Sequence, residues 1–240
     1  MKEGMCMFPL FYGIDSTYIL VIIGLVLTLA ASAKVKSTFA KYSRVRSMSG
    51  MTGAEAAQRL LHSSGIYDVQ IERVSGQLSD HYDPRRKILR LSDSVYGQNS
   101  VAAIGVAAHE VGHAIQHNRA YIPLKLRAAI VPLVNFGSAV SWPVILFGAF
   151  IARSQFLIDI GIILFSLAVL FQLITLPVEF NASRRAIARL DETGILQGNE
   201  LGHTKKVLGA AALTYVAGAA AAILSLLRVL ILFGGGRRRD

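Results

Sequence analysis

Four stretches of this chain are apolar, carry no charged residue and are long enough to cross a bilayer, which takes roughly 17–25 residues in a helix. They comprise residues 16–33, 128–152, 160–178 and 207–227. Charged residues make up only 17% of the 240 residues, whereas about 25% is usual in soluble domains. The sequence therefore predicts a mainly α-helical integral membrane protein with about four transmembrane helices. The alternative is a soluble protein in which these stretches are buried core helices.

The first apolar stretch is predicted to be an uncleaved anchor. It follows the acidic residues Glu3 and Asp15, whereas a secretory signal peptide begins with a basic segment and has a shorter apolar part. A cleaved signal peptide is the alternative, because the segment ASA at residues 31–33 is close to a cleavage site.

The net charge of +10 is distributed in a way that predicts topology. No nucleic-acid partner is expected, because Lys and Arg are spread over several loops and form no recognisable binding motif. With four spans, residues 34–127 and 179–206 face the same side of the membrane. The first region holds 14 Lys or Arg and the second holds 5. The opposite side holds 5, among them Lys2 and the tail at 237–239. The positive-inside rule then predicts a multi-pass protein of the inner (plasma) membrane, with the two polar regions in the cytoplasm.

A single cysteine, Cys6, excludes a disulfide framework and any Cys-rich zinc module.

The polar region after the first span is predicted to be compactly folded. Thr52 and Glu55 have the spacing of a capping box, which predicts a helix that begins there and ends at residues 62–65. Alternating apolar residues predict strands at 69–74 and 87–91, with a turn at 80–84 between them. The second strand is expected either as an ordinary strand or as an edge strand that can pair with an extended peptide.

The most informative segment is HEVGH, in a helix predicted at residues 101–118 with Ser100 or the residue before it as N-cap. Because His109 and His113 are four residues apart, both imidazoles lie on one face of the helix and can reach a single Zn²⁺. Glu110 then lies beside the ion as a base for its bound water. The alternative is an amphipathic helix with two incidental His residues.

A catalytic zinc site uses three protein ligands and leaves the fourth position to water. The candidate third ligand is Glu179, because a carboxylate at the end of a spanning helix is costly unless it has a partner. The alternative is a structural Glu that either snorkels at the membrane edge or pairs with Arg184 or Arg185. A continuous helix carries His117 further round the metal, so His117 is expected in a hydrogen-bonding or surface role.

The chain resembles the YugP-like neutral zinc metallopeptidases of bacterial membranes. The resemblance covers nearly the whole chain and is carried by DHYDPRRKILRLS at 80–92, HEVGHAIQ at 109–116, PVEFNASRRA at 177–186 and AALTYVA at 211–217. It implies a gluzincin-type zinc peptidase with His109, His113 and Glu179 as metal ligands and Glu110 as catalytic base. It also implies a small zincin-like α+β catalytic region at the membrane surface.

The layout is also similar to that of HtpX-type membrane proteases, which usually carry an Asp four residues after the third ligand. This sequence has Ser183 there instead, so the carboxylate expected behind a ligand is replaced by a hydroxyl. The side chains of His81, His203 and Tyr215 are candidate donors to the oxyanion of a tetrahedral intermediate.

The predicted function is a membrane-embedded zinc metalloendopeptidase that acts on polypeptides, membrane proteins included, in contact with the lipid bilayer. The alternative is a non-catalytic membrane protein, a transporter or scaffold, with a structural or vestigial zinc site. The oligomeric state is left open. The predicted organisation is an N-terminal segment with the first span (1–33), a catalytic region (34–127), the second and third spans (128–178), a third-ligand segment (179–206), and the fourth span with a basic tail (207–240).

Overall fold

The computed structural model describes residues 15–234, so Lys2, Cys6 and the basic tail at 237–239 lie outside the described residues. The helices are α1 (Tyr18–Tyr42), α2 (Gly53–Ser63), α3 (Val101–Asn118), α4 (Ile122–Leu146), the π-helical turn η1 (Phe147–Ile151), α5 (Gln155–Glu192) and α6 (Asn199–Phe233). The strands are β1 (Gln70–Val74), β2 (His81–Asp83) and β3 (Ile88–Ser92).

Four of the described helices are long and apolar enough to cross a membrane, which confirms the prediction of about four spans. They are α1, α4 with η1, α5 and α6. Each is longer than the apolar stretch that predicted it, because the helical backbone continues into the polar regions. The clearest case is α5, which runs for 38 residues through Pro177 without a break.

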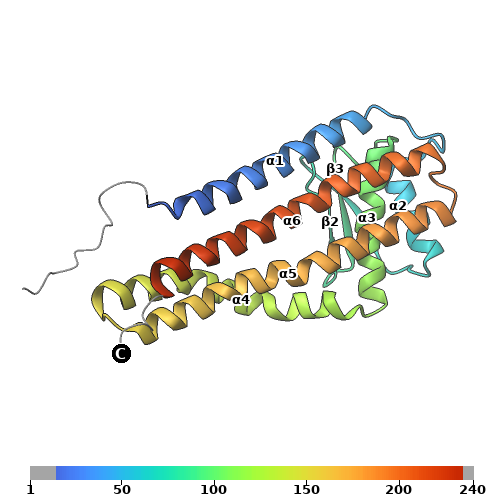
Figure 1. Ribbon diagram of the computed structural model, residues 1–240. Coiled ribbons are helices and arrows are strands. Elements are labelled where there is room, and N and C mark those ends of the chain that lie inside the picture. Colours follow the sequence, from blue (N-terminus) through green and yellow to red (C-terminus); the bar gives the residue numbers. More distant parts are fainter. Residues whose placement is uncertain (1–14, 235–240) are drawn as a thin grey trace, which may run out of the picture.

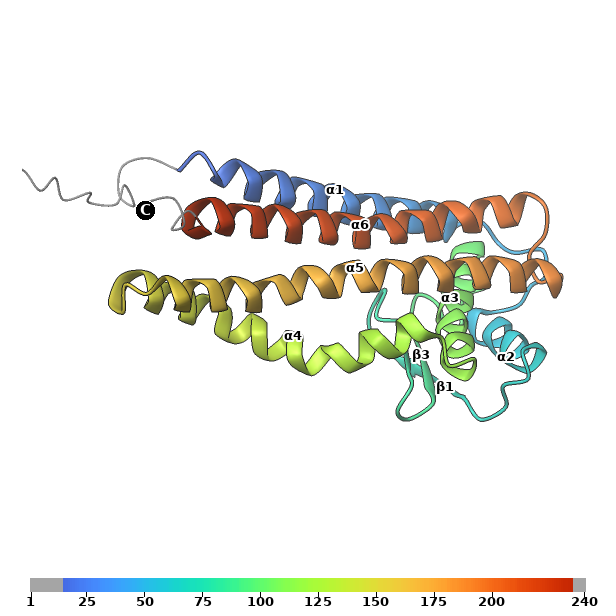
Figure 2. The same ribbon diagram turned by 60° about the horizontal axis from the view of Figure 1, so that its bottom comes forward.

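The long helices are arranged as a row in which α6 lies between α1 and α5, and α5 lies between α6 and α4 (Figures 1 and 2). The remaining elements are gathered at one end of this row, where α1 ends and α4 begins. The end of α5 and the start of α6 reach the same place. The two polar regions of the sequence therefore meet at one end of the helices, as four spans require.

The folded region at this end is built on the local signals that the sequence carries. Thr52 accepts a hydrogen bond from the backbone of Glu55 and Glu55 caps Thr52 in return, so the predicted capping box opens α2. Gly65 has a positive φ of 73° just after α2, a conformation that Gly adopts without steric cost. The buried core joins α2, α3 and β3 to the end of α5 and the start of α6.

The sheet corrects one prediction and decides between two alternatives. The segment expected as a turn at 80–84 contains strand β2, and the turn comes after Asp83, where Lys87 has a positive φ of 56°. The strand expected at 87–91 is β3, and it is not an edge strand. The sheet order is β1-β3-β2, with β1 parallel and β2 antiparallel to β3, so β3 is central and β2 is an edge.

Candidate metal centre

The helix that carries HEVGH begins where the sequence predicts. Ser100 is the N-cap of α3, and its side chain accepts a hydrogen bond from the backbone of Ala103. The helix then packs against α5 at very short range, since a Cβ built on Gly112 would lie 2.5 Å from the carbonyl oxygen of Ala182. The Gly in HEVGH therefore lets the backbones of α3 and α5 approach closely enough to bring their polar side chains together.

Three of the predicted site residues meet at this crossing. One ligand atom from each of His109, His113 and Glu179 lies within 4.8 Å of the others. The Oε2 atom of Glu179 is 3.3 Å from Nε2 of His109 and 3.4 Å from Nε2 of His113. Glu179 is 2% exposed, and its Oε2 has no hydrogen-bond partner within residues 15–234 although it is buried.

These donors fit a zinc ion. A buried carboxylate oxygen without a partner is energetically costly. Here this oxygen faces two imidazole nitrogens, and imidazole nitrogen is a common zinc ligand. Two imidazoles and one carboxylate form a ligand set known from catalytic zinc sites, with the fourth position left for water. The arrangement therefore supports zinc as the cofactor.

Hydrogen bonds on the far side of the imidazoles orient them. Nδ1 of His113 lies 3.1 Å from Oε1 of Gln116, and its Nε2 is directed at Glu179. Gln116 is fully buried and donates to the carbonyl of Val178 at 2.8 Å, the residue just before Glu179. Nδ1 of His109 lies 3.1 Å from Oγ of Ser183, so the Ser183 hydroxyl contacts a candidate ligand.

The charge partner of Glu179 is a residue that the sequence interpretation missed. Nη1 of Arg127 lies 3.1 Å from Oε1 of Glu179, whereas the expected alternatives Arg184 and Arg185 form no ion pair with it among the described residues. Arg127 is in the first turns of α4 and Glu179 follows the apolar part of α5. The positive charge of Arg127 at the start of the span before α5 was the sequence signal from which this ion pair could have been predicted.

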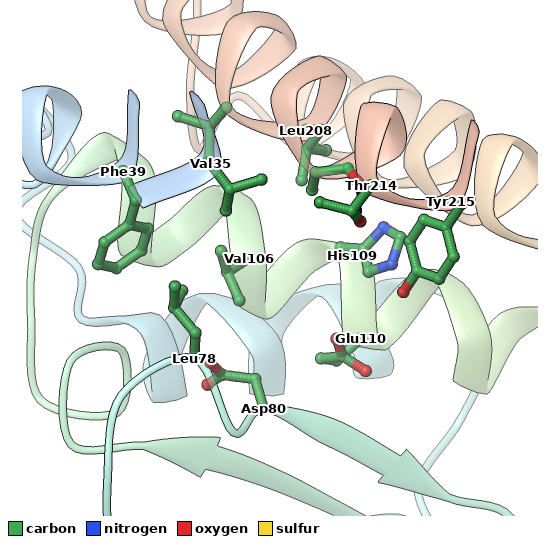
Figure 3. A pocket seen from close by; sticks show the side chains of 12 residues that line it. Val35, Phe39, Leu78, Asp80, Val106, His109, Glu110, Leu208, Thr214 and Tyr215 are labelled. Atoms are coloured by element: carbon green, nitrogen blue, oxygen red, sulfur yellow. Dashed lines mark hydrogen bonds between the residues drawn. The ribbon is translucent and has the colours of Figure 1, made fainter. Parts of the chain in front are cut away.

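Glu110 lies beside these residues in a cleft of about 200 Å³ between α1, α3, α6 and the loop before β2. Figure 3 shows His109, Glu110 and Tyr215 on the wall of this cleft, with Asp80 and Leu78 across from them. Glu110 is 8% exposed, and no ion pair holds its carboxylate within residues 15–234. Burial raises the pKa of Asp80, which accepts hydrogen bonds from the backbone and hydroxyl of Ser92.

The remaining candidates occupy different positions. Of the three candidate oxyanion donors, only Tyr215 lines the cleft. His81 is exposed and donates through Nδ1 to the Ser79 carbonyl, and His203 stacks on Tyr42 with ring centres 4.8 Å apart.

His117 has the hydrogen-bonding role that the sequence predicts. Its Nδ1 lies 2.9 Å from the hydroxyl of Tyr82 in strand β2, and it is not part of the group of candidate metal ligands. Burial raises the pKa of Tyr82 to about 12, so the hydroxyl stays protonated near neutral pH. This bond joins the edge strand of the sheet to the helix that carries HEVGH.

Comparison with known proteins agrees with this chemistry. Residues 17–234 match the protein family described as "putative neutral zinc metallopeptidase". The chain is also 53% identical over 218 residues to a Bacillus subtilis (strain 168) protein named "Putative membrane protease YugP", a match that covers 91% of this chain and 96% of that protein. No solved structure matches the chain. These matches confirm the resemblance that the sequence motifs indicated.

Proposed function

The chain belongs to the neutral zinc metallopeptidase family, and from this premise we propose that it is a membrane-embedded, gluzincin-type metalloendopeptidase. The observation that carries the proposal is the convergence of His109, His113 and Glu179, next to a cleft that His109 and Glu110 line. We assign the first three as zinc ligands and Glu110 as the general base. Zinc, when bound, polarises the scissile carbonyl and lowers the pKa of a bound water.

Glu110 is suited to accept and release a proton. Its carboxylate lines the cleft and is not paired with a cation among the described residues, so it is available as an acceptor. A general base must lie within hydrogen-bond reach of the proton that it abstracts. As a neighbour of the ligand His109 on the same helix, Glu110 can take a proton from the attacking water and pass it to the leaving amine.

Tyr215 is the proposed donor to the developing oxyanion. It reaches the cleft from α6, opposite the helix that carries HEVGH (Figure 3). A preorganised hydroxyl in such a position stabilises negative charge that appears only in the transition state. Arg127 holds Oε1 of Glu179, which leaves Oε2 directed at the two imidazoles.

The substrate is proposed to be an extended polypeptide, membrane proteins included. Strand β2 has one hydrogen-bonded neighbour in the sheet, and the residues just before it, Leu78 and Asp80, line the cleft. Addition of a peptide to an edge strand holds it by main-chain hydrogen bonds. The peptide pairing that was one of two alternatives for residues 87–91 is therefore proposed for β2. The site is proposed to face the cytoplasm from the inner membrane, as the charge distribution predicts.

The test compares the wild-type protein with Glu110→Gln on an unfolded protein substrate, with and without a chelator. We expect zinc to stay bound, because Gln is nearly isosteric and replaces no ligand, and turnover to fall by about 10²-fold or more. Chelation should abolish wild-type cleavage, and added zinc should restore it. Full chelator-sensitive activity in Glu110→Gln would refute the assignment of the base. A zinc-loaded wild-type protein that cleaves nothing would favour the non-catalytic alternative.

A further inference from the structure

A second cavity, of about 450 Å³, lies between α1 and α6 outside the catalytic cleft. The two helices run side by side along their length in both views (Figures 1 and 2). The cavity is lined by Lys34 and Lys41 of α1 and by Lys206 of α6. Lys34 directly follows the first apolar stretch and Lys206 directly precedes the fourth. The cavity therefore lies at the boundary between the apolar and polar parts of both helices.

The three ammonium groups form no ion pair with the part of the chain that the structure describes. The ion pairs formed within residues 15–234 use other cations. The described parts of α1 and α6 contain one acidic residue, Glu200, and it accepts a hydrogen bond from the backbone of Met48 instead. Like charges that line one cavity repel each other, and a bound anion removes that cost.

The other surfaces of the cavity indicate what kind of anion it can hold. Ala210 and Leu213 line it on the membrane side, and Leu213 is 48% exposed. The rest of the lining is polar and basic, because Ser37, Thr38 and Tyr42 accompany the three lysines. A ligand that fills both parts carries an anionic group next to an apolar chain, as a phospholipid does. Basic pockets between membrane helices are known to bind lipid headgroups.

We propose that the α1–α6 cavity binds the phosphodiester headgroup of an anionic phospholipid through Lys34, Lys41 and Lys206. Lysine binds phosphate as a point charge, so the three groups can share one headgroup without strict geometry. The acyl chains lie along the apolar surface next to Leu213. The proposal concerns binding and does not depend on peptidase activity.

The bound lipid would also support one wall of the catalytic cleft. The same two helices line the cleft with other residues, Val35 and Phe39 of α1 and Leu208 of α6. Between cavity and cleft, Tyr42, Ala102 and Val207 form a small buried cluster. A headgroup that bridges α1 and α6 therefore holds together the two helices that cover the metal centre.

The test measures lipid binding to the full-length protein in neutral detergent by native mass spectrometry, with phosphatidylglycerol and phosphatidylcholine as probes. Wild type is expected to retain one phosphatidylglycerol and to prefer it to phosphatidylcholine. Because a lysine near an anionic headgroup contributes about fivefold in affinity, Lys34→Gln with Lys206→Gln should weaken phosphatidylglycerol binding about 25-fold. The double variant Lys34→Arg with Lys206→Arg should retain phosphatidylglycerol binding, because it keeps both positive charges.

The matched control is Lys36→Gln with Lys205→Gln, which removes the same number of charges from the same helices, one or two positions away, from residues that do not line this cavity. Equal weakening in the control pair would show non-specific surface attraction and overturn the proposal. Inorganic phosphate is the second arm: competition as strong as that of the lipid at equal concentration would identify a free-phosphate site and overturn the lipid assignment. Unchanged melting temperatures of both variants without lipid exclude misfolding as the cause.

Discussion

The close contact between α3 and α5 makes Gly112→Ala the most informative substitution at the metal centre. The new Cβ would lie 2.5 Å from the carbonyl oxygen, 3.0 Å from the carbonyl carbon and 3.1 Å from the Cα of Ala182. All three are backbone atoms, which cannot rotate away as the end of a flexible side chain can. Since ordinary contact begins at 3.4 Å, the helices must separate by about 0.9 Å along the shortest line.

This displacement is large for a metal site. Two proposed ligands are on α3 and the third is on α5, so separation of the helices pulls the ligand set apart. Ligand distances in metal sites hold to within about 0.2 Å, and overpacking a tight contact costs about 1–3 kcal/mol. We expect Gly112→Ala to weaken zinc binding by about 10- to 100-fold, to lower the melting temperature and to reduce turnover.

Zinc affinity is measured by competition with a chromophoric chelator, and the melting temperature of the apoprotein is measured in parallel. The matched control is Gly202→Ala in α6, where a Cβ would meet nothing within 4 Å. Helix propensity alone favours Ala over Gly by about 1 kcal/mol, so the control should be neutral or stabilising. Wild-type zinc affinity and stability in Gly112→Ala would refute the argument that this Gly positions the ligands.

Three further predictions concern the ligand set, the oxyanion donor and the topology. Glu179→Ala should lower the zinc content per chain while His117→Ala should not, and the reverse result would move the third ligand onto α3. Tyr215→Phe should lower kcat by about 10²-fold with zinc content unchanged, and wild-type kcat would exclude it as the donor. In a cysteine-free background, Ser154→Cys should react with a membrane-impermeant thiol reagent on intact cells and Ser94→Cys should not, whereas the opposite pattern would invert the topology.

The features that the sequence predicts correctly are those set by local or one-dimensional constraints. The spans follow from the length and polarity that a bilayer imposes, and the HEVGH helix carries two candidate ligands at fixed spacing on one face. The N-cap Ser100 and the capping box at Thr52 are local hydrogen-bonding patterns as well. None of these depends on how distant parts of the chain meet.

The features that the sequence interpretation missed depend on contacts between residues that are far apart in the sequence. Arg127 pairs with Glu179, 52 positions away, and Gln116 becomes a ligand support only because α5 passes beside it. Strand β2 was expected as a turn because Asp and Pro favour turns, yet Tyr82 pairs with Leu89 in the sheet. Pairing within a sheet outweighs the local preference there, and it also makes β3 central.

The unbroken course of α5 has a consequence for where the proposed peptidase can cut a chain. Glu179 follows the last apolar residue of the third span on the same continuous helix, and each helical residue adds about 1.5 Å. The proposed third ligand is therefore held at a fixed height, one residue or about 1.5 Å along the helix axis from the apolar boundary. A peptide bond presented to the metal centre lies within a few residues of the point at which a membrane-anchored substrate leaves the bilayer. Under the proposed peptidase function, proximity to the lipid surface then contributes to the choice of the bond, as well as side-chain identity.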